Sequence, residues 1–164
     1  MPVDFYIEDE RSGVDVDRQV RFAEMLLQAA GEADAEVSIA VVTDDQIRSL
    51  NRRYRGIDAA TDVLSFAQRE GPSLGQGFAL GDVVISHDAA QRQAAELGHS
   101  LDDEISELVF HGFLHLAGHD HAGERRPQWD GMEDRLIRAL QQQAAPFVPC
   151  GLTDRAPGTC SGVE

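Results

Sequence analysis

The segment HGFLHLAGHDH, residues 111–121, carries three histidines at a spacing typical of a metal site. His111 and His115 are four residues apart, so on a helix they project from consecutive turns of one face. Gly118 can adopt the left-handed conformation that ends a helix, after which the chain can bring His121 back as a third ligand. Three imidazoles with an open fourth position are typical of catalytic zinc, so we expect one Zn²⁺ per chain. Imidazole also suits other divalent metals.

Four further polar side chains lie near these histidines in the sequence. Asp120 could orient a ligand histidine, whereas we expect His119 to be an exposed turn residue rather than a competing ligand. Glu104 and Glu107 fall on roughly the same helix face as His111. They would either accept hydrogen bonds from the ligands or form a solvated face, and the sequence leaves both interpretations open.

The same histidine spacing occurs in the metzincin proteases, whose pattern is H-E-x-x-H-x-x-G-x-x-H. The glutamate after their first histidine is the general base, but that position is Gly112 here. Glycine cannot take a proton, so a zinc peptidase or other amidohydrolase is disfavoured. That alternative would require Glu104 or Glu107 to reach the attacking water.

Two more blocks accompany the histidine segment in the same order along the chain. The first is LNRRYRGIDAATDVLSF, residues 50–66, and the second is LGDVVIS, residues 80–86. Together the three blocks resemble the YbeY family, the metal-dependent endoribonucleases of bacterial rRNA maturation. The family patterns are H-G-x-L-H-L-x-G-Y-D-H and L-N-x-x-Y-R-x-x-D-x-x-T-[DN]-V-L-S-F, and His119 replaces the usual tyrosine. The resemblance covers roughly residues 1–145.

This resemblance implies both a site and a function. It implies that His111, His115 and His121 are the metal ligands, that the metal lies in a cleft, and that Arg55 is functionally important. It also implies single-strand-specific cleavage in the 3′-end maturation of small-subunit rRNA, in ribosome biogenesis and in ribosome quality control. The implied partners are single-stranded rRNA and the small ribosomal subunit with its assembly factors.

The charge distribution bears directly on RNA binding. The net charge is −15, and all 14 basic residues are arginines. Such acidity disfavours general binding to nucleic-acid backbones, DNA included. Arg48, Arg52, Arg53 and Arg55 nevertheless fall within one short segment, which is either a phosphate-binding patch or a solvated helix face. We therefore expect selective engagement of RNA through this patch and the metal.

These residues suggest hydrolysis of a phosphodiester at a single-metal site. Arg55 would hold the phosphate and stabilise charge in the transition state. Asp120, His119 or a water could be the general acid, and either water or the ribose 2′-hydroxyl could attack. A non-catalytic, metal-stabilised ribosome assembly factor is the remaining alternative.

Periodicity predicts one α/β or α+β domain over residues 1–145 and a disordered tail over 146–164. The sequence pattern predicts four short strands, partly parallel, and about five helices, and the resemblance implies that the strands form a small mixed sheet packed against the helices. Asp15 or Asp17 and Thr43 are expected helix caps, and Gly112 would allow close approach of a neighbouring element. Met132 would form either a metzincin-like turn or part of the core. The predicted strands are 4–8, 37–42, 62–66 and 82–86, the helices 16–30, 44–55, 88–97, 101–116 and about 128–143, and the long loop 67–80.

The ends of the sequence suggest a cytoplasmic protein. The first ten residues, MPVDFYIEDE, are acidic and do not form a secretory signal. No apolar run reaches the length that a bilayer requires, so no membrane partner is expected. Cys150 and Cys160 lie in the polar tail, where we expect free thiols.

Overall fold

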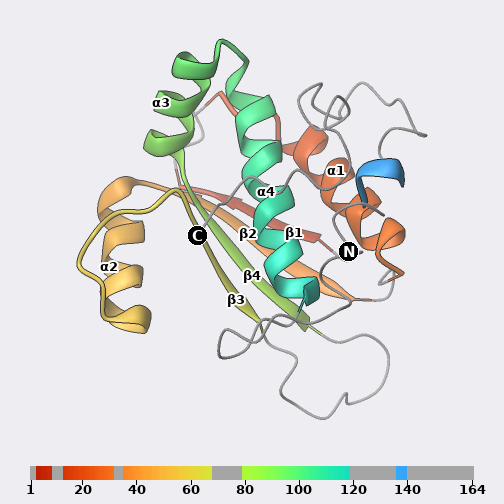
Figure 1. Cartoon of the computed structure of the whole chain (residues 1–164), viewed down its shortest axis with the longest axis horizontal. Helices are drawn as coiled ribbons and strands as arrows, with labels where there is room; N and C mark the ends of the chain where they lie inside the picture. Colours follow the sequence, from red (N-terminus) through yellow and green to blue (C-terminus); the bar gives the residue numbers. More distant parts are fainter. Residues whose placement is uncertain (1–2, 9–12, 32–34, 68–78, 119–135, 140–164) are drawn as a thin grey trace.

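The computed structural model describes residues 3–8, 13–31, 35–67, 79–118 and 136–139. Residues 68–78 of the predicted loop 67–80, Met132 and the tail with both cysteines lie outside this part. Residues 136–139 are helical, within the last predicted helix. The other elements, in chain order (Figure 1), are β1 (Val3–Ile7), α1 (Val16–Ala29), β2 (Glu36–Val42), α2 (Asp44–Arg55), β3 (Val63–Ala67), β4 (Ala79–Ser86), α3 (His87–Leu97) and α4 (Leu101–Gly118).

The four strands form one mixed sheet in the order β1-β2-β4-β3. Strand β2 pairs in parallel with both β1 and β4, whereas β3 pairs antiparallel with β4. The β-branched run of β2 therefore lies inside the sheet with a neighbour on each side, as expected for a buried strand. The predicted four-stranded, partly parallel sheet is confirmed.

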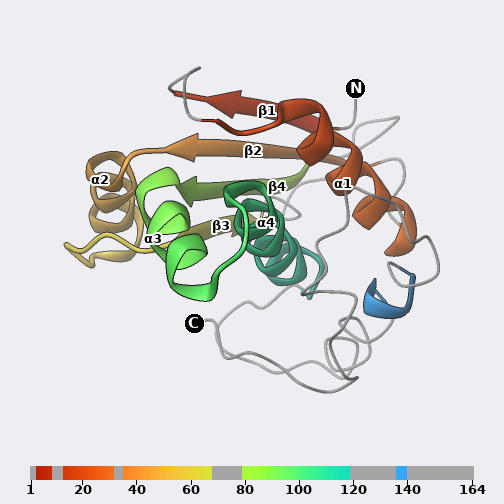
Figure 2. The ribbon, with the colours of Figure 1, turned by 90° about the horizontal axis from the view of Figure 1, so that it is seen from above.

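Alternate residues of the strands belong to two separate cores, one on each face of the sheet. Val37, Ile39 and Val41 of β2 join the larger core, which α1 and α4 cover. Val42 belongs to a smaller core beneath α2, together with Ile47 of that helix. Because successive side chains of a strand point to opposite faces, α4 and α2 lie on opposite faces of the sheet. Figure 2 shows α2 at the end of the sheet far from α1.

The helix starts follow the predicted caps. Asp15 accepts a hydrogen bond from the Arg18 amide before α1, and Thr43 accepts one from the Gln46 amide before α2. Ser86 accepts a hydrogen bond from the Ala89 amide and caps α3. This helix begins at His87, one residue earlier than predicted. Helix α2 ends at Gly56, whose φ of 73° is in the left-handed region that favours glycine.

The predicted boundary of β4 was wrong. The strand begins at Ala79 rather than Asp82, and Leu80 is fully buried in the larger core. The glycines nearby suggested a loop, but Ala79 pairs with Glu36 of β2 and Gly81 pairs with Ala67 of β3. Pairing of β4 with both β2 and β3 thus outweighs the local preference of glycine for loops. Helix α4 also runs two residues further than predicted, to Gly118.

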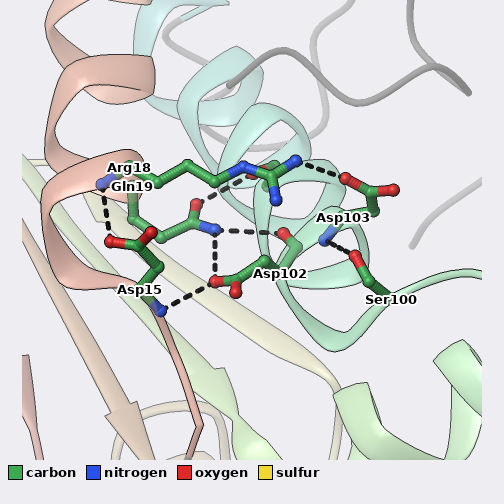
Figure 3. Close-up of polar contacts among 7 residues, drawn as sticks. Asp15, Arg18, Gln19, Ser100, Asp102 and Asp103 are labelled. Carbon is green, nitrogen blue, oxygen red and sulfur yellow. Dashed lines mark hydrogen bonds and ion pairs between the residues drawn. The ribbon is translucent and has the colours of Figure 1, made fainter. Parts of the chain in front are cut away.

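A buried polar network joins the first turns of α1 and α4 (Figure 3). The Gln19 side chain donates to the backbone carbonyl of Asp102 at 3.0 Å and to its carboxylate at 3.2 Å. The Ser106 hydroxyl donates to the Gln19 amide oxygen at 2.9 Å. Both Gln19 and Ser106 are fully buried, and Arg18 forms an ion pair with Asp103 beside them. This network fixes the N-terminal half of α4 against α1.

Candidate functional site

Helix α4 presents two of the predicted metal ligands. His111 and His115 lie on consecutive turns of the helix, as their spacing predicted. His111 is buried beside the edge of the Phe110 ring, with centroids 5.9 Å apart, and His115 is half-buried. The neutral imidazole nitrogens of these two residues are donors that zinc accepts in catalytic sites. The donor chemistry therefore fits the predicted metal.

The third predicted ligand lies outside the described part of the chain. His121 belongs to residues 119–135, as do His119 and Asp120, so their places in a site stay predictions. Among the residues that the structure does describe, no three histidine, cysteine or acidic side chains are grouped closely enough to hold a metal. The two imidazoles of α4 are thus the described portion of the candidate centre.

Gly112 sets the distance between α4 and the sheet. A Cβ atom placed on Gly112 would lie 2.6 Å from Cγ1 of Val83 in β4, well inside van der Waals contact. The expected close approach of a neighbouring element is therefore confirmed. The same geometry bears on the peptidase alternative, because a side chain at position 112 would point into the sheet. A glutamate there would not project beside His111 and His115.

Glu104 does not belong to a solvated face. Its side chain is 3% exposed, and its Oε1 lies 3.4 Å from Nε2 of His99. Burial raises the pKa of the Glu104 carboxyl, the nearby charge of Glu107 raises it further, and His99 opposes the shift. Seven residues of helix place Glu104 roughly 10 Å along the axis from His111. Glu104 is therefore part of the contact between the α3–α4 turn and α4.

The arginine cluster lies on the exposed side of α2. Arg48 is already paired with Asp58. Its Nε lies 2.8 Å from Oδ1 of Asp58, and its Nη2 lies 3.3 Å from Oδ2 of the same carboxylate. This pairing raises the pKa of Arg48 and lowers that of Asp58. In the described part of the chain, the guanidinium groups of Arg52 and Arg55 make no hydrogen bond or ion pair and are exposed. These two, with Arg53, are the arginines open to a phosphate.

The arginines and the two described histidines lie on helices that pack on opposite faces of the sheet. Tyr54 of α2 contacts Phe66 of β3 on the face that carries the smaller core. Helix α4 packs on the other face, where Val63 of the same strand joins the larger core. The edge strand β3 thus lies between the two helices (Figure 1). Arg55 and the two histidines are therefore carried by helices that pack on opposite faces of the sheet.

One surface feature was not predicted from the sequence. A groove of about 580 Å³ lies between α2 and the sheet, and Tyr6 of β1 and Tyr54 of α2 both line it. The two tyrosines are far apart in the chain, so only the tertiary structure brings them to one groove.

No helix in the described ranges is long and apolar enough to cross a membrane.

A solved structure with the same fold is known. The solution structure of a Thermotoga maritima protein superposes with a TM-score of 0.54, covering 96% of this chain and 99% of that one. The two sequences are 24% identical. This similarity supports the α+β fold alone.

Sequence comparisons identify the family. The family model described as endoribonuclease YbeY matches residues 5–143. The endoribonuclease YbeY of Pelotomaculum thermopropionicum is 56% identical over 127 residues, covering 75% of this chain and 79% of that protein. The one from Heliobacterium modesticaldum is 38% identical over 159 residues, covering 83% of this chain and 95% of that protein. These matches run through all three sequence blocks, and the chain belongs to the YbeY family.

Proposed function

We propose that this protein is a metal-dependent endoribonuclease that cleaves single-stranded RNA. Its role would be in the 3′-end maturation of small-subunit rRNA and in ribosome quality control, in the cytoplasm, with the small subunit and its assembly factors as partners. The observation that carries the proposal is the family match over residues 5–143, which contains the two histidines on consecutive turns of α4.

His111, His115 and His121 would hold one Zn²⁺ per chain. The chemistry that zinc supplies when bound is that of a Lewis acid, which acidifies an attacking water and polarises a phosphate. The protein contributes a rigid support for the imidazoles. Close packing of Gly112 against Val83 and the buried contacts of Gln19 hold α4 in place, which supports the orientation that ligands need.

The arginines of α2 would bind the RNA backbone. A guanidinium is always charged and binds a phosphate through two hydrogen bonds. Because α2 and α4 lie on opposite faces, we propose that the RNA passes the edge strand β3. Arg55, Arg52 and Arg53 would then hold phosphates while the cleaved bond lies at the histidines. Arg48 would have to exchange Asp58 for a phosphate.

The general acid and the nucleophile each have a short list of candidates. Asp120, His119 and water are the candidates for the acid. Attack by the ribose 2′-hydroxyl leaves a cyclic phosphate, whereas attack by water does not. A substrate with one 2′-deoxy sugar at the cleaved position separates the two routes, since an unchanged rate would eliminate the 2′-hydroxyl.

The first test is cleavage of an end-labelled RNA spanning the small-subunit rRNA 3′ end. We expect the wild type to cleave, a chelator to stop cleavage and added zinc to restore it. His115→Ala removes one imidazole and should abolish cleavage. His99→Ala is the matched control, because His99 contacts Glu104 rather than the metal centre, and it should retain cleavage.

Two results would contradict this proposal. Equal cleavage by the wild type and His115→Ala would mean that the activity does not depend on the predicted metal ligands. Specific binding of the RNA with no cleavage, in wild type loaded with zinc, would instead favour the non-catalytic assembly factor. Circular dichroism of each variant establishes that the fold is intact.

A further inference from the structure

The face of the sheet that α2 covers is only partly occupied. Residues on this face form two rows across the paired strands, because each row follows the strand register. Helix α2 packs over the side near β3, through Ile47 and Leu50, and leaves the side near β1 open. The two rows are Asp4–Ser38–Asp82–Phe66 and Tyr6–Ala40–Val84–Leu64.

The open part of this face is the groove of about 580 Å³ described above. Small side chains, Ser38 and Ala40, occupy the positions on the central strand β2. Tyr6 contributes from β1 and is 61% exposed, while Tyr54 contributes from α2 and is 59% exposed. Both are large aromatic side chains with more than half of their surface exposed to solvent, and both line the same groove. The groove therefore combines two exposed aromatic side chains with small side chains on the central strand.

The ring of Tyr54 is held in place by its neighbours. Phe66 meets it edge-on with centroids 5.4 Å apart, and the Arg53 guanidinium lies 5.5 Å from its centroid. A ring fixed in this way loses little conformational entropy when a planar ligand stacks on it. The neighbouring guanidinium adds positive charge at the same place.

The charges around the groove are arranged by sign. Arg52, Arg53 and Arg55 lie in the last turn of α2, beside Tyr54, in a chain whose net charge is −15. The sheet floor carries Asp4, Ser38 and Asp82, which supply hydrogen-bond acceptors and negative charge, whereas the arginines lie at the rim beside Tyr54 rather than in the lining. Positive charge beside the aromatic wall with acceptors on the floor is complementary to a nucleotide. The phosphate is anionic, and a base edge carries donors.

We propose that this groove binds a guanine base of single-stranded RNA. The guanine would stack on Tyr6, which shares a face of β1 with Asp4, and an adjacent base would stack on Tyr54. The N1 and N2 donors of the guanine would meet the Asp4 carboxylate, a pairing that uses both carboxylate oxygens. The flanking phosphates would contact the arginines of α2. The inference rests on the proposed function in taking RNA as the ligand, and it adds a second contact site on the face opposite the histidines.

The test measures RNA binding separately from cleavage. Fluorescence anisotropy compares the RNAs U3GU3, U3AU3 and U7 on the full chain, and a denaturing gel confirms that each RNA stays intact. Tyr54→Ala and Tyr6→Ala should each weaken binding of U3GU3 by between about fivefold and a hundredfold, the range for losing one base-stacking partner. Tyr54→Phe and Tyr6→Phe keep the stacking surface and should bind like the wild type.

The base preference gives a second readout. Asp4→Asn replaces one acceptor oxygen by a donor, so the preference for U3GU3 over U3AU3 should disappear while general binding to U7 persists. Leu97→Ala is the matched control, because Leu97 is also exposed but lies on α3 outside the groove. It should leave all three affinities unchanged.

Unchanged RNA affinity in both tyrosine-to-alanine variants would overturn the inference. If those variants instead lost binding of a lysine–leucine model peptide with RNA affinity intact, the groove would be a peptide site and the inference would be wrong. The inference and the proposed function can fail independently. Tyrosine-dependent RNA binding without any cleavage would refute only the function, and cleavage with tyrosine-independent binding would refute only the groove.

Discussion

The two faces of the sheet are covered in different ways. Beneath α1 and α4, the larger core contains three fully or nearly fully buried phenylalanines, Phe22, Phe110 and Phe113. Among the described residues, four buried apolar side chains, one of them from α2 itself, make up the smaller core between α2 and the sheet, and a groove remains open beside them. The polar contacts differ in the same sense. Gln19 and Ser106 are buried on the first face, whereas Arg48 and Asp58 are exposed on the second.

This difference matches the tasks proposed for the two faces. Metal ligands must keep their relative positions within a fraction of an ångström, which requires support from close packing. The histidines lie on the closely packed face. Contacts to a flexible polyanion tolerate movement and depend mainly on charge, and the unpaired arginines lie on the open face. If the two tasks are divided in this way, substitutions beneath α1 and α4 should lower stability, whereas substitutions on α2 should weaken RNA binding.

The largest effect is expected from removing the buried contact between α1 and α4. Gln19→Ala leaves the Ser106 hydroxyl and the Asp102 carbonyl without their partner and creates a cavity. We expect it to lower the free energy of unfolding by roughly 2–4 kcal/mol. Gln46→Ala is the matched control on α2, because Gln46 contacts Glu8 on the surface. It should cost less than about 0.5 kcal/mol. Urea unfolding compares the two, and equal losses would remove the distinction between the faces.

A charge reversal on α2 should affect substrate binding rather than the chemical step. Arg55→Glu replaces an exposed, unpaired cation by an anion. If Arg55 holds a phosphate away from the cleaved bond, KM should rise about tenfold to a hundredfold while kcat changes little. Arg21→Glu, on the exposed side of α1, is the control and should change neither. A fall in kcat at unchanged KM would instead place Arg55 at the cleaved phosphate, as the sequence suggested.

Gly112→Ala tests the contact that positions the histidines. The added methyl group meets Val83, whose branched side chain has little freedom to move. Overpacking typically costs 1–3 kcal/mol, from which alanine recovers up to about 1 kcal/mol by its better helix propensity. We expect a net loss of up to about 2 kcal/mol. Combining Gly112→Ala with Val83→Ala should recover part of it, and simple additivity in this double-mutant cycle would contradict the proposed contact.

The smallest effect concerns the pH dependence of stability. Because burial raises the pKa of Glu104 in the folded chain, the folded state holds its proton more tightly than the unfolded state. This contribution to stability is therefore present at acid pH and is lost as pH rises through the folded pKa. Glu104→Gln should unfold at a higher temperature than wild type at pH 7, with the difference vanishing at acid pH.

The control for this change is Glu96→Gln, an exposed residue of α3. It should leave the curve of melting temperature against pH unchanged. If Glu104→Gln were less stable than wild type at pH 7, the contact with His99 would outweigh the cost of burial.

The sequence predicted most of the local structure because the signals were local. Thr43 capped the helix that followed it, and the spacing of His111 and His115 placed them on one helix face. Leu80 was wrongly placed in a loop, because its burial depends on strand pairing with residues distant in the chain. Local sequence signals thus predicted which helices and strands form better than they predicted where the strands end.

The site was predictable only in part, for a similar reason. Helical periodicity could not show that Glu104 is buried, because the α3–α4 turn that brings His99 against it is a tertiary contact. The groove between Tyr6 and Tyr54 also needs two elements from different parts of the chain. The third metal ligand, His121, stays a prediction.

The strand order β1-β2-β4-β3 also has a consequence for how the chain folds. Strand β4 has two neighbours at very different distances along the chain. Only residues 68–78 separate it from β3, whereas residues 43–78 separate it from β2. Closing the longer loop costs more entropy, and non-local strand pairing slows folding. We therefore expect the β3–β4 pair to form early and the β2–β4 pairing to limit the rate. Variants of Phe66 in β3 and of Ile39 in β2 should then both slow refolding, because both pairings are present at the rate-limiting step.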